Sequence, residues 1–424
     1  MNKLLLKPTI LNGNIITPPS KSMGHRAIIC ASLSKGQSII SNFDYSDDMI
    51  ATIEAIISLG SQIECFDKHL VINGNLTFSK KELFINCNES GSTLRFMIPI
   101  TLTNKSKVTF IGQGELGKRP LDIYYNIFNQ QGIHYEFKTD ILDLKIEGIL
   151  KNDNFEIAGN VSSQFISGLM FALPLLEGDS LITLTSPLES KAYLDLTIDM
   201  LKKYGIKIET INKHQYKILG KQDYKAINYT VEGDYSQASF FLVANALGNN
   251  ISINGLKKDS LQGDKETIEV LKRMGCKFNL KDYKISNHQQ LKATVIDGSQ
   301  CPDVIPVLSV AASVAKGTTV IKNAKRLRIK ECDRLKAMAT ELNKLGAKIQ
   351  ETEDGLIIEG VERLKGGEVS SWNDHRIAMS LAIASTICQE EVIINQPECV
   401  KKSYPNFWKD FEKLGGKVHG SQLG

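Results

Sequence analysis

The feature of this sequence that most constrains its fold is a repeat with a period of about 70 residues. In each copy, an amphipathic, helix-like stretch ends at a glycine, and a short strand-like run follows it. A glycine is typical of a helix C-terminus, because it adopts left-handed backbone angles without steric strain. The repeat glycines are Gly60, Gly132, Gly205, Gly275, Gly346 and Gly415. The spacing therefore predicts six copies of one structural unit.

A second helix, more apolar than the first, is expected earlier in each repeat. It begins at polar residues and leads into a strand-like run in "PSKSMGHRAIICASL", "ESGSTLRFMIPIT", "SSQFISGLMFALPLL", "GDYSQASFFLVANAL", "CPDVIPVLSVAASV" and "WNDHRIAMSLAIAS". Helices that alternate with strands indicate the α/β class. Solenoid repeats generally have periods of ~20 to 50 residues, so we expect two globular domains of three repeats each. A large repeat scaffold that binds other proteins is the alternative.

Length and composition narrow the possible functions. A chain of 424 residues exceeds one ordinary core and is expected to form two or three domains. The net charge of +4 is too small to indicate nucleic-acid binding. The eight cysteines form no C-x-x-C pair, which favours buried thiols in a reducing compartment over disulfides or a metal site. No signal peptide or membrane-spanning run is recognisable, so we expect a cytoplasmic protein that does not bind membranes.

The stretch "KVTFIGQGELGKRPLD" places Gly112, Gly114 and Gly117 in the pattern of a dinucleotide-binding loop, and Glu136 follows at about the expected distance. In a dinucleotide-binding domain, the helix would already have begun at the last glycine. Here Pro120 favours a later helix start, and the equivalent loops of other repeats lack these glycines. We therefore interpret the stretch as the strand-to-helix loop of the second repeat rather than an NAD site.

Basic side chains gather at the expected starts of the apolar helices. The first repeat has Lys21 and Arg26 there, the second has Arg95, and the sixth has His375 and Arg376. A helix N-terminus carries free N–H groups and a partial positive charge, so cations in its first turn indicate a bound anion. Ordinary capping by Ser, Asn and Asp is the alternative for any single start. Three basic starts in one repeat family favour an anion site.

Two further features refine the chemistry of such a site. The fifth repeat begins with Asp303, an acid that transfers a proton, binds a substrate hydroxyl or simply caps its helix. The segment 324–336 is strongly basic, and if it is helical, Lys330 and Arg334 share a face that a phosphate or carboxylate would stabilise. A solvated helix surface is the alternative. The sequence has no P-loop, metal cluster or nucleophile elbow, so we expect small, multiply anionic ligands.

The motifs of the chain, taken in order, resemble those of the 5-enolpyruvylshikimate-3-phosphate synthases, a family of enolpyruvyl transferases. They are "PSKSMGHRA", "ESGSTLR", "GKRPLD", "SSQF", "ESKAYLD", "CPD", "RIKECDRL", "NDHRIAMS" and "KKSYPNF", and they cover essentially the whole chain. The resemblance implies two inverse α/β domains with an active-site cleft between them. One would be discontinuous, with residues 1–17 and 231–424 and the fourth to sixth repeats, and the other would be residues 18–230.

The reaction that this resemblance implies belongs to the shikimate pathway, which leads to chorismate and the aromatic amino acids. The enolpyruvyl group of phosphoenolpyruvate is transferred to the 5-hydroxyl of shikimate 3-phosphate through a tetrahedral intermediate, and phosphate is released. The family needs no metal ion or cofactor. We expect these small anionic substrates to be the partners of a monomeric protein.

The resemblance also assigns roles to individual residues. The implied catalytic residues, which transfer protons, are Lys21, Asp303 and Glu331. The residues implied to bind shikimate 3-phosphate are Lys21, Ser22, Arg26, Ser162, Ser163, Gln164, Ser190, Tyr193, Asp303 and Lys330. Those implied to bind phosphoenolpyruvate are Lys21, Gly91, Arg119, Gln164, Arg334, His375, Arg376 and Lys402.

The chain departs from the family's pattern at two places. Many members carry a further arginine shortly before the "RP" pair, where this chain has residues 113–115, so Arg119 is taken as the ligand of phosphoenolpyruvate. Members often have an asparagine four residues before the lysine of "KE", where this chain has Arg326. The contacts to shikimate 3-phosphate near Arg326 are therefore expected to differ from those usual in the family.

The alternative activity is that of the sister enzyme, which transfers enolpyruvyl to UDP-N-acetylglucosamine. Its corresponding loop carries a reactive cysteine, whereas this chain has Gly114 there and no cysteine between Cys87 and Cys276. We therefore interpret the glycine-rich stretch as an active-site loop that ends in Arg119. A repeat protein that only binds an anionic metabolite is a further alternative, which the presence of all three implied catalytic residues disfavours.

Overall fold

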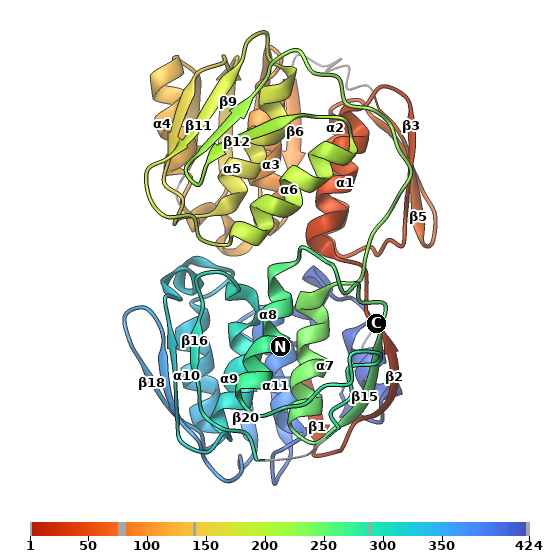
Figure 1. Cartoon of the computed structure of the whole chain (residues 1–424), viewed down its shortest axis with the longest axis vertical. Coiled ribbons are helices and arrows are strands. Elements are labelled where there is room, and N and C mark those ends of the chain that lie inside the picture. Colours follow the sequence, from red (N-terminus) through yellow and green to blue (C-terminus); the bar gives the residue numbers. More distant parts are fainter. Residues whose placement is uncertain (1, 75–81, 139–140, 287–289, 421–424) are drawn as a thin grey trace. The chain divides into compact units, whose positions relative to one another are not determined.

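The computed structural model describes residues 2–74, 82–138, 141–286 and 290–420. The chain divides into two compact units (Figure 1). Unit 1 combines Met1–Pro18 with Gly233–Gly424, and unit 2 is Pro19–Glu232. Both units contain helices and strands in alternation, so the expected mixed α/β class is confirmed.

An amphipathic helix ends at each of the repeat glycines, as the period predicts. These helices are α2 (Asp47–Ser58), α4 (Asp122–Gln131), α6 (Lys191–Lys203), α8 (Glu266–Arg273), α10 (Arg334–Lys344) and α12 (Phe407–Lys413). The six glycines all have a left-handed φ, between 69° and 105°. A larger residue would be strained at these angles, which explains why each helix ends at a glycine.

The apolar helices form the interior of each unit. Unit 2 contains α1 (Lys21–Leu33), α3 (Gly91–Thr101) and α5 (Ser163–Ala172), and unit 1 contains α7 (Tyr235–Ala246), α9 (Ile305–Ser313) and α11 (His375–Ser385). Every residue of α9 and α11 is buried. A helix that is apolar on all sides is stable only within a core. Accordingly, α9 packs against both α7 and α11, and α3 packs against α5 (Figure 1).

In the described part of the chain, five sheets follow one plan, in which a parallel pair is extended by two antiparallel strands. In the second repeat, β6 (Glu82–Asn86) is parallel to β7 (Ser106–Ile111), which is antiparallel to β9 (Asp143–Gly148), and β8 (His134–Lys138) forms the edge. The same order occurs in β14 (Tyr229–Thr230), β3 (Gln37–Ser41), β5 (His69–Asn73), β4 (Gln62–Cys65); in β10 (Asn154–Ile157), β11 (Ser180–Leu184), β13 (Gln215–Ile218), β12 (Ile208–Asn212); and in β16 (Val295–Asp297), β17 (Thr318–Lys322), β19 (Leu356–Glu359), β18 (Lys348–Glu351).

The N-terminal strands explain why unit 1 is discontinuous. In the sheet of the last repeat, β20 (Gly367–Ser370) and β21 (Val392–Asn395) form the parallel pair, and β22 (Lys417–His419) forms the edge. The strand between them is β1 (Lys3–Lys7), which is antiparallel to both neighbours. Likewise, β2 (Asn12–Ile16) is parallel to β15 (Asn250–Asn254). The first strands of the chain therefore complete sheets of the fourth and sixth repeats.

The glycine-rich loop of the second repeat does not have the geometry of a dinucleotide site. After β7, the chain forms a short 3-10 turn, η1 (Gly114–Lys118), and α4 begins only at Asp122. A Cβ atom on Gly112 would lie 2.8 Å from the Asn88 carbonyl oxygen, and one on Gly117 would lie 2.5 Å from the Leu142 amide nitrogen. Glycine is therefore needed for close packing within unit 2. The interpretation as a strand-to-helix loop is confirmed.

Candidate active site

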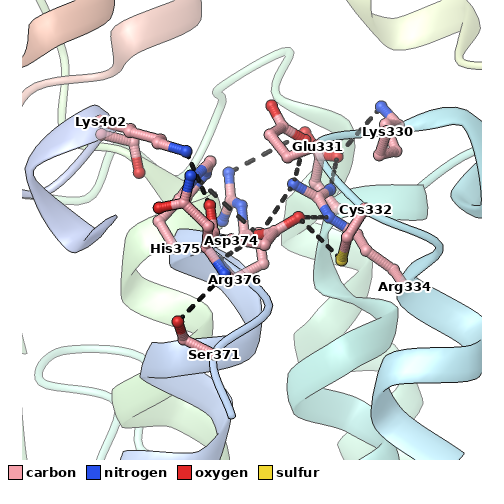
Figure 2. A network of polar contacts seen from close by, with 12 residues as sticks. Lys330, Glu331, Cys332, Arg334, Ser371, Asp374, His375, Arg376 and Lys402 are labelled. Atoms are coloured by element: carbon pink, nitrogen blue, oxygen red, sulfur yellow. Dashed lines mark hydrogen bonds and ion pairs between the residues drawn. The ribbon is translucent and has the colours of Figure 1, made fainter. Parts of the chain in front are cut away.

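In unit 1, the starts of three helices bring acidic and basic side chains together (Figure 2). We call this group the Arg334 cluster, and its members are Asp303, Lys330, Glu331, Arg334, Asp374 and Arg376. Asp303 lies in the turn η4 (Pro302–Val304) that precedes α9, Arg334 is the first residue of α10, and Asp374 is the N-cap of α11. The repeat therefore places chemically different residues at equivalent helix starts.

Arg334 is the centre of the cluster, with only 2% of its side chain exposed. Its Nε donates to Asp374 Oδ2 at 2.8 Å, Nη1 donates to Asp303 Oδ1 at 3.0 Å, and Nη2 donates to Glu331 Oε2 at 2.7 Å. Burial alone would lower the pKa of Arg334, but the three carboxylates raise it well above its ordinary value. One guanidinium therefore holds three acids in fixed positions, because its planar fork donates in several directions.

Asp303 is held as a carboxylate by the cations around it. Besides Arg334, it contacts Lys330 Nζ at 3.3 Å and Arg376 Nη2 at 3.9 Å. Burial would raise the pKa of Asp303, but the charges of Lys330, Arg376 and Arg334 hold it well below its usual range. Cys301 and Val304 are the N-cap residues of η4 and α9, so Asp303 lies within the turn and not at either N-cap position. An ionised carboxylate in this position is suited to accept a hydrogen bond from a hydroxyl group.

The basic segment 324–336 is only partly helical. Residues Lys325–Ile329 form the 3-10 turn η5, Lys330 lies between this turn and the helix, and α10 begins at Arg334. Lys330 and Arg334 therefore do not share a helix face. They are brought together by their common contact with Asp303 instead.

Further cations of unit 1 lie at the start of α11. Arg376 donates from Nη1 to the Ser236 carbonyl oxygen at 3.3 Å, and its guanidinium lies 5.9 Å from the centre of the Phe240 ring. Among the described residues, its Nε has no hydrogen-bond partner. Lys402, at the end of the 3-10 turn η6 (Pro397–Lys402), donates to the Asn373 carbonyl oxygen at 2.7 Å. His375 is buried at the first position of α11. A buried arginine with an open donor is a suitable ligand for an anion.

Asp264 is a further buried acid of unit 1. It lies in the turn η3 (Gly263–Lys265), and its carboxylate accepts a hydrogen bond from the hydroxyl of Ser236. Burial, together with the negative charge of Asp303, raises the pKa of Asp264 to about 6, although Arg376 opposes the rise. This acid is therefore expected to titrate close to neutral pH, unlike Asp303.

Replacement of Asp264 by Asn is expected to change how stability depends on pH. An unfolded aspartate has a pKa of about 3.9, so the native protein binds this proton more tightly than the unfolded chain does. The resulting stabilisation is complete below about pH 4 and is lost as the pH rises to about 6. Between pH 4 and 7, the free energy of unfolding of the wild type should fall relative to Asp264→Asn by on the order of 2 kcal/mol. Urea denaturation measures this difference, and a constant difference across the range would contradict the raised pKa.

In unit 2, a second group of polar residues surrounds the starts of α1, α3 and α5. Lys21, the first residue of α1, forms a partly buried ion pair with Asp48 of α2, with 2.6 Å between Nζ and Oδ2. Ser162 is the N-cap of α5, and its side chain accepts a hydrogen bond from the Gln164 amide. Ser163 is buried beside it as the first residue of α5. The starts of α1 and α5 therefore present the ammonium group of Lys21 together with neutral hydroxyl and amide groups.

Arg26 is bound to neutral groups in this structure. Its Nε donates to Thr197 Oγ1 at 2.8 Å, while Nη1 and Nη2 donate to the carbonyl oxygens of Ser22 and Tyr193 at 2.7 and 2.9 Å. Burial lowers the pKa of Arg26 to about 10, which leaves the group charged at neutral pH. Ser190, which has a left-handed φ of 53°, precedes α6 beside Tyr193. Arg26 thus ties α1 to α6 and brings the backbones of Ser22 and Tyr193 together.

Two guanidinium groups face the start of α3. Arg95 Nη1 donates to Gln164 Oε1 at 2.8 Å, and Gln164 Nε2 donates to Ser92 Oγ at 2.9 Å. A Cβ atom on Gly91 would lie 3.0 Å from Nη1 of both Arg95 and Arg119. A side chain at this position would therefore require both guanidiniums to shift by a few tenths of an ångström. Two adjacent cations beside a helix N-terminus form a suitable binding site for an anion.

The structure thus places the sequence-predicted residues in two groups, one in each unit. Unit 1 holds Asp303, Lys330, Glu331, Arg334, His375, Arg376 and Lys402, and unit 2 holds Lys21, Ser22, Arg26, Gly91, Arg119, Ser162, Ser163, Gln164, Ser190 and Tyr193. Three residues that bond to these groups were not among the implied catalytic or binding residues: Asp48, Arg95 and Asp374, although Arg95 was noted as a basic helix start. Arg95 and Asp374 stand at polar helix starts and were detectable, whereas Asp48 lies on an amphipathic helix and carries no distinguishing pattern.

The described residues contain no group of three His, Cys, Asp or Glu side chains placed to hold a metal ion. Among them, no helix combines the length and the apolar character that crossing a membrane requires. Buried cations at helix starts, together with fixed carboxylates, define an α/β protein that binds small anions and has acid–base groups beside them. This is the class to which the fold and the two groups of residues point.

Comparison with known proteins identifies the family. The sequence model described as EPSP synthase (3-phosphoshikimate 1-carboxyvinyltransferase) matches residues 5–411, so the chain belongs to this family. A relative from Clostridium perfringens named 3-phosphoshikimate 1-carboxyvinyltransferase is 57% identical over 423 residues, which span 99% of this chain and 100% of the relative. One of the same name from Clostridioides difficile is 54% identical over 436 residues and 100% of both chains.

A solved structure supports the same assignment. EPSP synthase from Acinetobacter baumannii has a TM-score of 0.81 and 25% identity over 100% of both chains. The enolpyruvyl transferase NikO from Streptomyces tendae has a TM-score of 0.79 at 14% identity, over 100% of this chain and 99% of its own, which shows the shared fold. The family and the fold expected from the ordered motifs are therefore confirmed.

Proposed function

We propose that this chain transfers the enolpyruvyl group of phosphoenolpyruvate to the 5-hydroxyl of shikimate 3-phosphate and releases phosphate. The match of the family over residues 5–411 carries this conclusion. The chain is a transferase of aromatic amino-acid biosynthesis, as the motifs predict. The alternative acceptor, UDP-N-acetylglucosamine, is not favoured, because the relatives at 54–57% identity bear the name of the shikimate enzyme.

In this proposal, shikimate 3-phosphate is bound mainly by hydroxyl, amide and cationic groups. They are Lys21, Ser22, Arg26, Ser162, Ser163, Gln164, Ser190 and Tyr193 of unit 2, with Asp303 and Lys330 of unit 1. The proximity of Arg26 to Ser22 and Tyr193 supports their joint role. The carboxylate of Asp303 accepts the hydrogen bond of the attacking 5-hydroxyl, and its fixed position between Arg334 and Lys330 supports this assignment.

Phosphoenolpyruvate carries a phosphate and a carboxylate, so it needs several cations. The proposed ligands are Lys21, Gly91, Arg119 and Gln164 of unit 2 and Arg334, His375, Arg376 and Lys402 of unit 1. Gly91 acts through its lack of a side chain, which keeps Arg119 close to the start of α3. Arg95 is added to this set because its guanidinium lies equally close to Gly91. Binding in a cleft between the two domains stays a prediction.

The chemistry requires three proton transfers and stabilisation of negative charge. The 5-hydroxyl loses a proton as its oxygen adds to C2 of phosphoenolpyruvate, and C3 gains a proton. The tetrahedral intermediate then loses a proton from C3 as the bond between C2 and the phosphate oxygen breaks, which restores the double bond and releases phosphate. Lys21, Asp303 and Glu331 are the proposed acid–base groups. Positioning and fixed charges supply the remaining acceleration. Burial would raise the pKa of Asp303, but the charges of Lys330, Arg376 and Arg334 lower it further than burial raises it. The ionised carboxylate is therefore better suited to accept a hydrogen bond than to hold a proton.

We also propose that the protein acts as a monomer in the cytoplasm without nucleic-acid or membrane partners. The small net charge of +4 supports the absence of a nucleic-acid partner. The cytoplasmic location is supported by the cysteines alone, because eight free thiols favour a reducing environment.

The product of the reaction tests the proposed function. Incubation of the purified protein with phosphoenolpyruvate and shikimate 3-phosphate should yield the carboxyvinyl ether of shikimate 3-phosphate, detected by mass spectrometry. A sample without protein and one without phosphoenolpyruvate serve as controls. A reaction that leaves shikimate 3-phosphate unchanged would leave only the anion-binding function.

A further inference from the structure

Glu341 is a buried acid of α10 with no place in the site described so far. Only 1% of its side chain is exposed. Its Oε1 accepts a hydrogen bond from Trp372 Nε1 at 2.7 Å, and its Oε2 accepts one from the Ser370 amide at 3.0 Å. Lys344, which is half-exposed, donates to both oxygens at 3.0 and 2.8 Å. A buried carboxylate persists only with such partners, and two of these bonds lead directly to the segment before α11.

The backbone of that segment has an unusual shape. Trp372 and Asn373 both have a left-handed φ of 53°, which non-glycine residues seldom adopt. Two such residues in succession persist only when their surroundings hold them firmly. The Trp372 amide donates to Ser370 Oγ at 3.0 Å, and the Asn373 amide donates to Ser371 Oγ at 3.2 Å. The indole N–H that binds Glu341 fixes the side chain of the first left-handed residue.

The shape of this segment determines where two residues of the site lie. The Asn373 carbonyl oxygen accepts the hydrogen bond of Lys402 Nζ at 2.7 Å. Asp374 follows immediately and accepts the 2.8 Å hydrogen bond of Arg334 Nε (Figure 2). If Trp372 and Asn373 returned to ordinary backbone angles, the carbonyl oxygen would turn away from Lys402, and Asp374 would move relative to Arg334.

We propose that Glu341 is a positioning residue for phosphoenolpyruvate binding. Its carboxylate holds Trp372 and Asn373 in their left-handed conformation. It thereby fixes the position of the Lys402 ammonium group and of the start of α11. This inference rests on the proposed function, because it takes Lys402, Arg334 and Arg376 as ligands of phosphoenolpyruvate. Glu341 touches neither substrate and acts through Trp372 and Ser370.

Glu341→Gln tests the proposal with little change in volume. Both carboxylate oxygens accept an N–H from the segment, whereas an amide offers only one oxygen, so one N–H would face an NH₂ group. The KM for phosphoenolpyruvate is expected to rise about tenfold, because one hydrogen bond to a charged group is lost. The KM for shikimate 3-phosphate should stay within about twofold of the wild-type value, since its proposed ligands lie outside this segment.

Two further variants separate positioning from general stability. Lys344→Met removes the half-exposed partner but leaves both bonds to the segment, so it should not change either KM. Trp372→Phe removes the indole N–H and keeps an aromatic ring, so it should raise the KM for phosphoenolpyruvate as Glu341→Gln does. The double variant Glu341→Gln/Trp372→Phe should be less than additive, because both changes break the same interaction.

Fluorescence provides a readout that is independent of activity. The chain has two tryptophans, so Trp408→Phe leaves Trp372 as the only tryptophan, whose emission is excited selectively at wavelengths that tyrosine does not absorb. In this background, Glu341→Gln should shift the emission of Trp372, while Lys344→Met should not. If the wild type makes no carboxyvinyl product but the emission shifts in Glu341→Gln, the proposed function is wrong, while the role of Glu341 in holding the segment before α11 is supported. If the wild type is active and Glu341→Gln or Trp372→Phe leaves the KM for phosphoenolpyruvate unchanged, the positioning role is overturned.

Discussion

Replacement of Arg334 by Met is expected to lower kcat/KM by about 10²–10³-fold and to reduce the free energy of unfolding by about 3–5 kcal/mol. Arg334 is 2% exposed and holds Asp303, Glu331 and Asp374 through one guanidinium. Methionine replaces the apolar stem of arginine but carries no charge, so three acids would lose their common cation. Steady-state kinetics and urea denaturation measure the two effects.

Arg328 offers a matched control for this variant. It also pairs with two acids, Asp333 at 2.7 Å and Glu351 at 3.0 Å, but a quarter of its side chain is exposed. Ion pairs open to solvent contribute about 0–1 kcal/mol, so Arg328→Met should cost about 1 kcal/mol or less and leave kcat/KM near the wild-type value. Arg334→Lys should recover little activity, because a point charge cannot bind three carboxylates as the planar group does. Equal losses in Arg328→Met and Arg334→Met would contradict this account.

Replacement of Asp303 by Asn is expected to lower kcat by about 10²–10⁴-fold, while the KM values of both substrates change much less. The amide keeps the size of the side chain and one acceptor oxygen, but it removes the charge that we propose faces the attacking hydroxyl. Asp303 lies 3.0 Å from Arg334 and 3.3 Å from Lys330, so its oxygens stay in place without substrate. Single-turnover kinetics at saturating substrates measure the chemical step directly.

The same variant has a defined effect on stability. The pKa of Asp303 is held, despite burial, well below its usual range by Lys330, Arg376 and Arg334. The contribution of this carboxylate to the free energy of unfolding is therefore fully present above the unfolded pKa of about 3.9. It is lost as the pH falls through the pKa of Asp303 in the native protein. The advantage of the wild type over Asp303→Asn should shrink on acidification below about pH 4. Asp297→Asn, which alters a surface acid six residues earlier, should leave kcat unchanged. Unchanged kcat in Asp303→Asn would contradict the proposed role.

Much of the fold was predictable because it depends on local patterns. The six glycines and the apolar helices follow from backbone conformation and from periodicity, which neighbouring residues determine. The pairing of β1 with the sheet of the last repeat was not predictable in this way. That pairing joins residues nearly 400 positions apart, and no local pattern in five residues specifies such a partner.

The candidate site shows the same division. The basic helix starts indicated Lys21, Arg376 and the anion chemistry, because charge at a helix N-terminus has a local physical meaning. The charge pattern alone could not distinguish Arg334 from Arg328, since both lie in one basic run and each has acids nearby, and only the resemblance to the family singled out Arg334. The difference arises from packing, which buries Arg334 between the starts of α9 and α11 and leaves Arg328 in contact with solvent.

The central claim is the identity of the acceptor, and phosphate release from phosphoenolpyruvate tests it most directly. Parallel reactions should contain the same protein and phosphoenolpyruvate, with either shikimate 3-phosphate or UDP-N-acetylglucosamine as acceptor. We expect release with shikimate 3-phosphate and none above background with the sugar nucleotide. Release with the sugar nucleotide alone, or with neither acceptor, would contradict it.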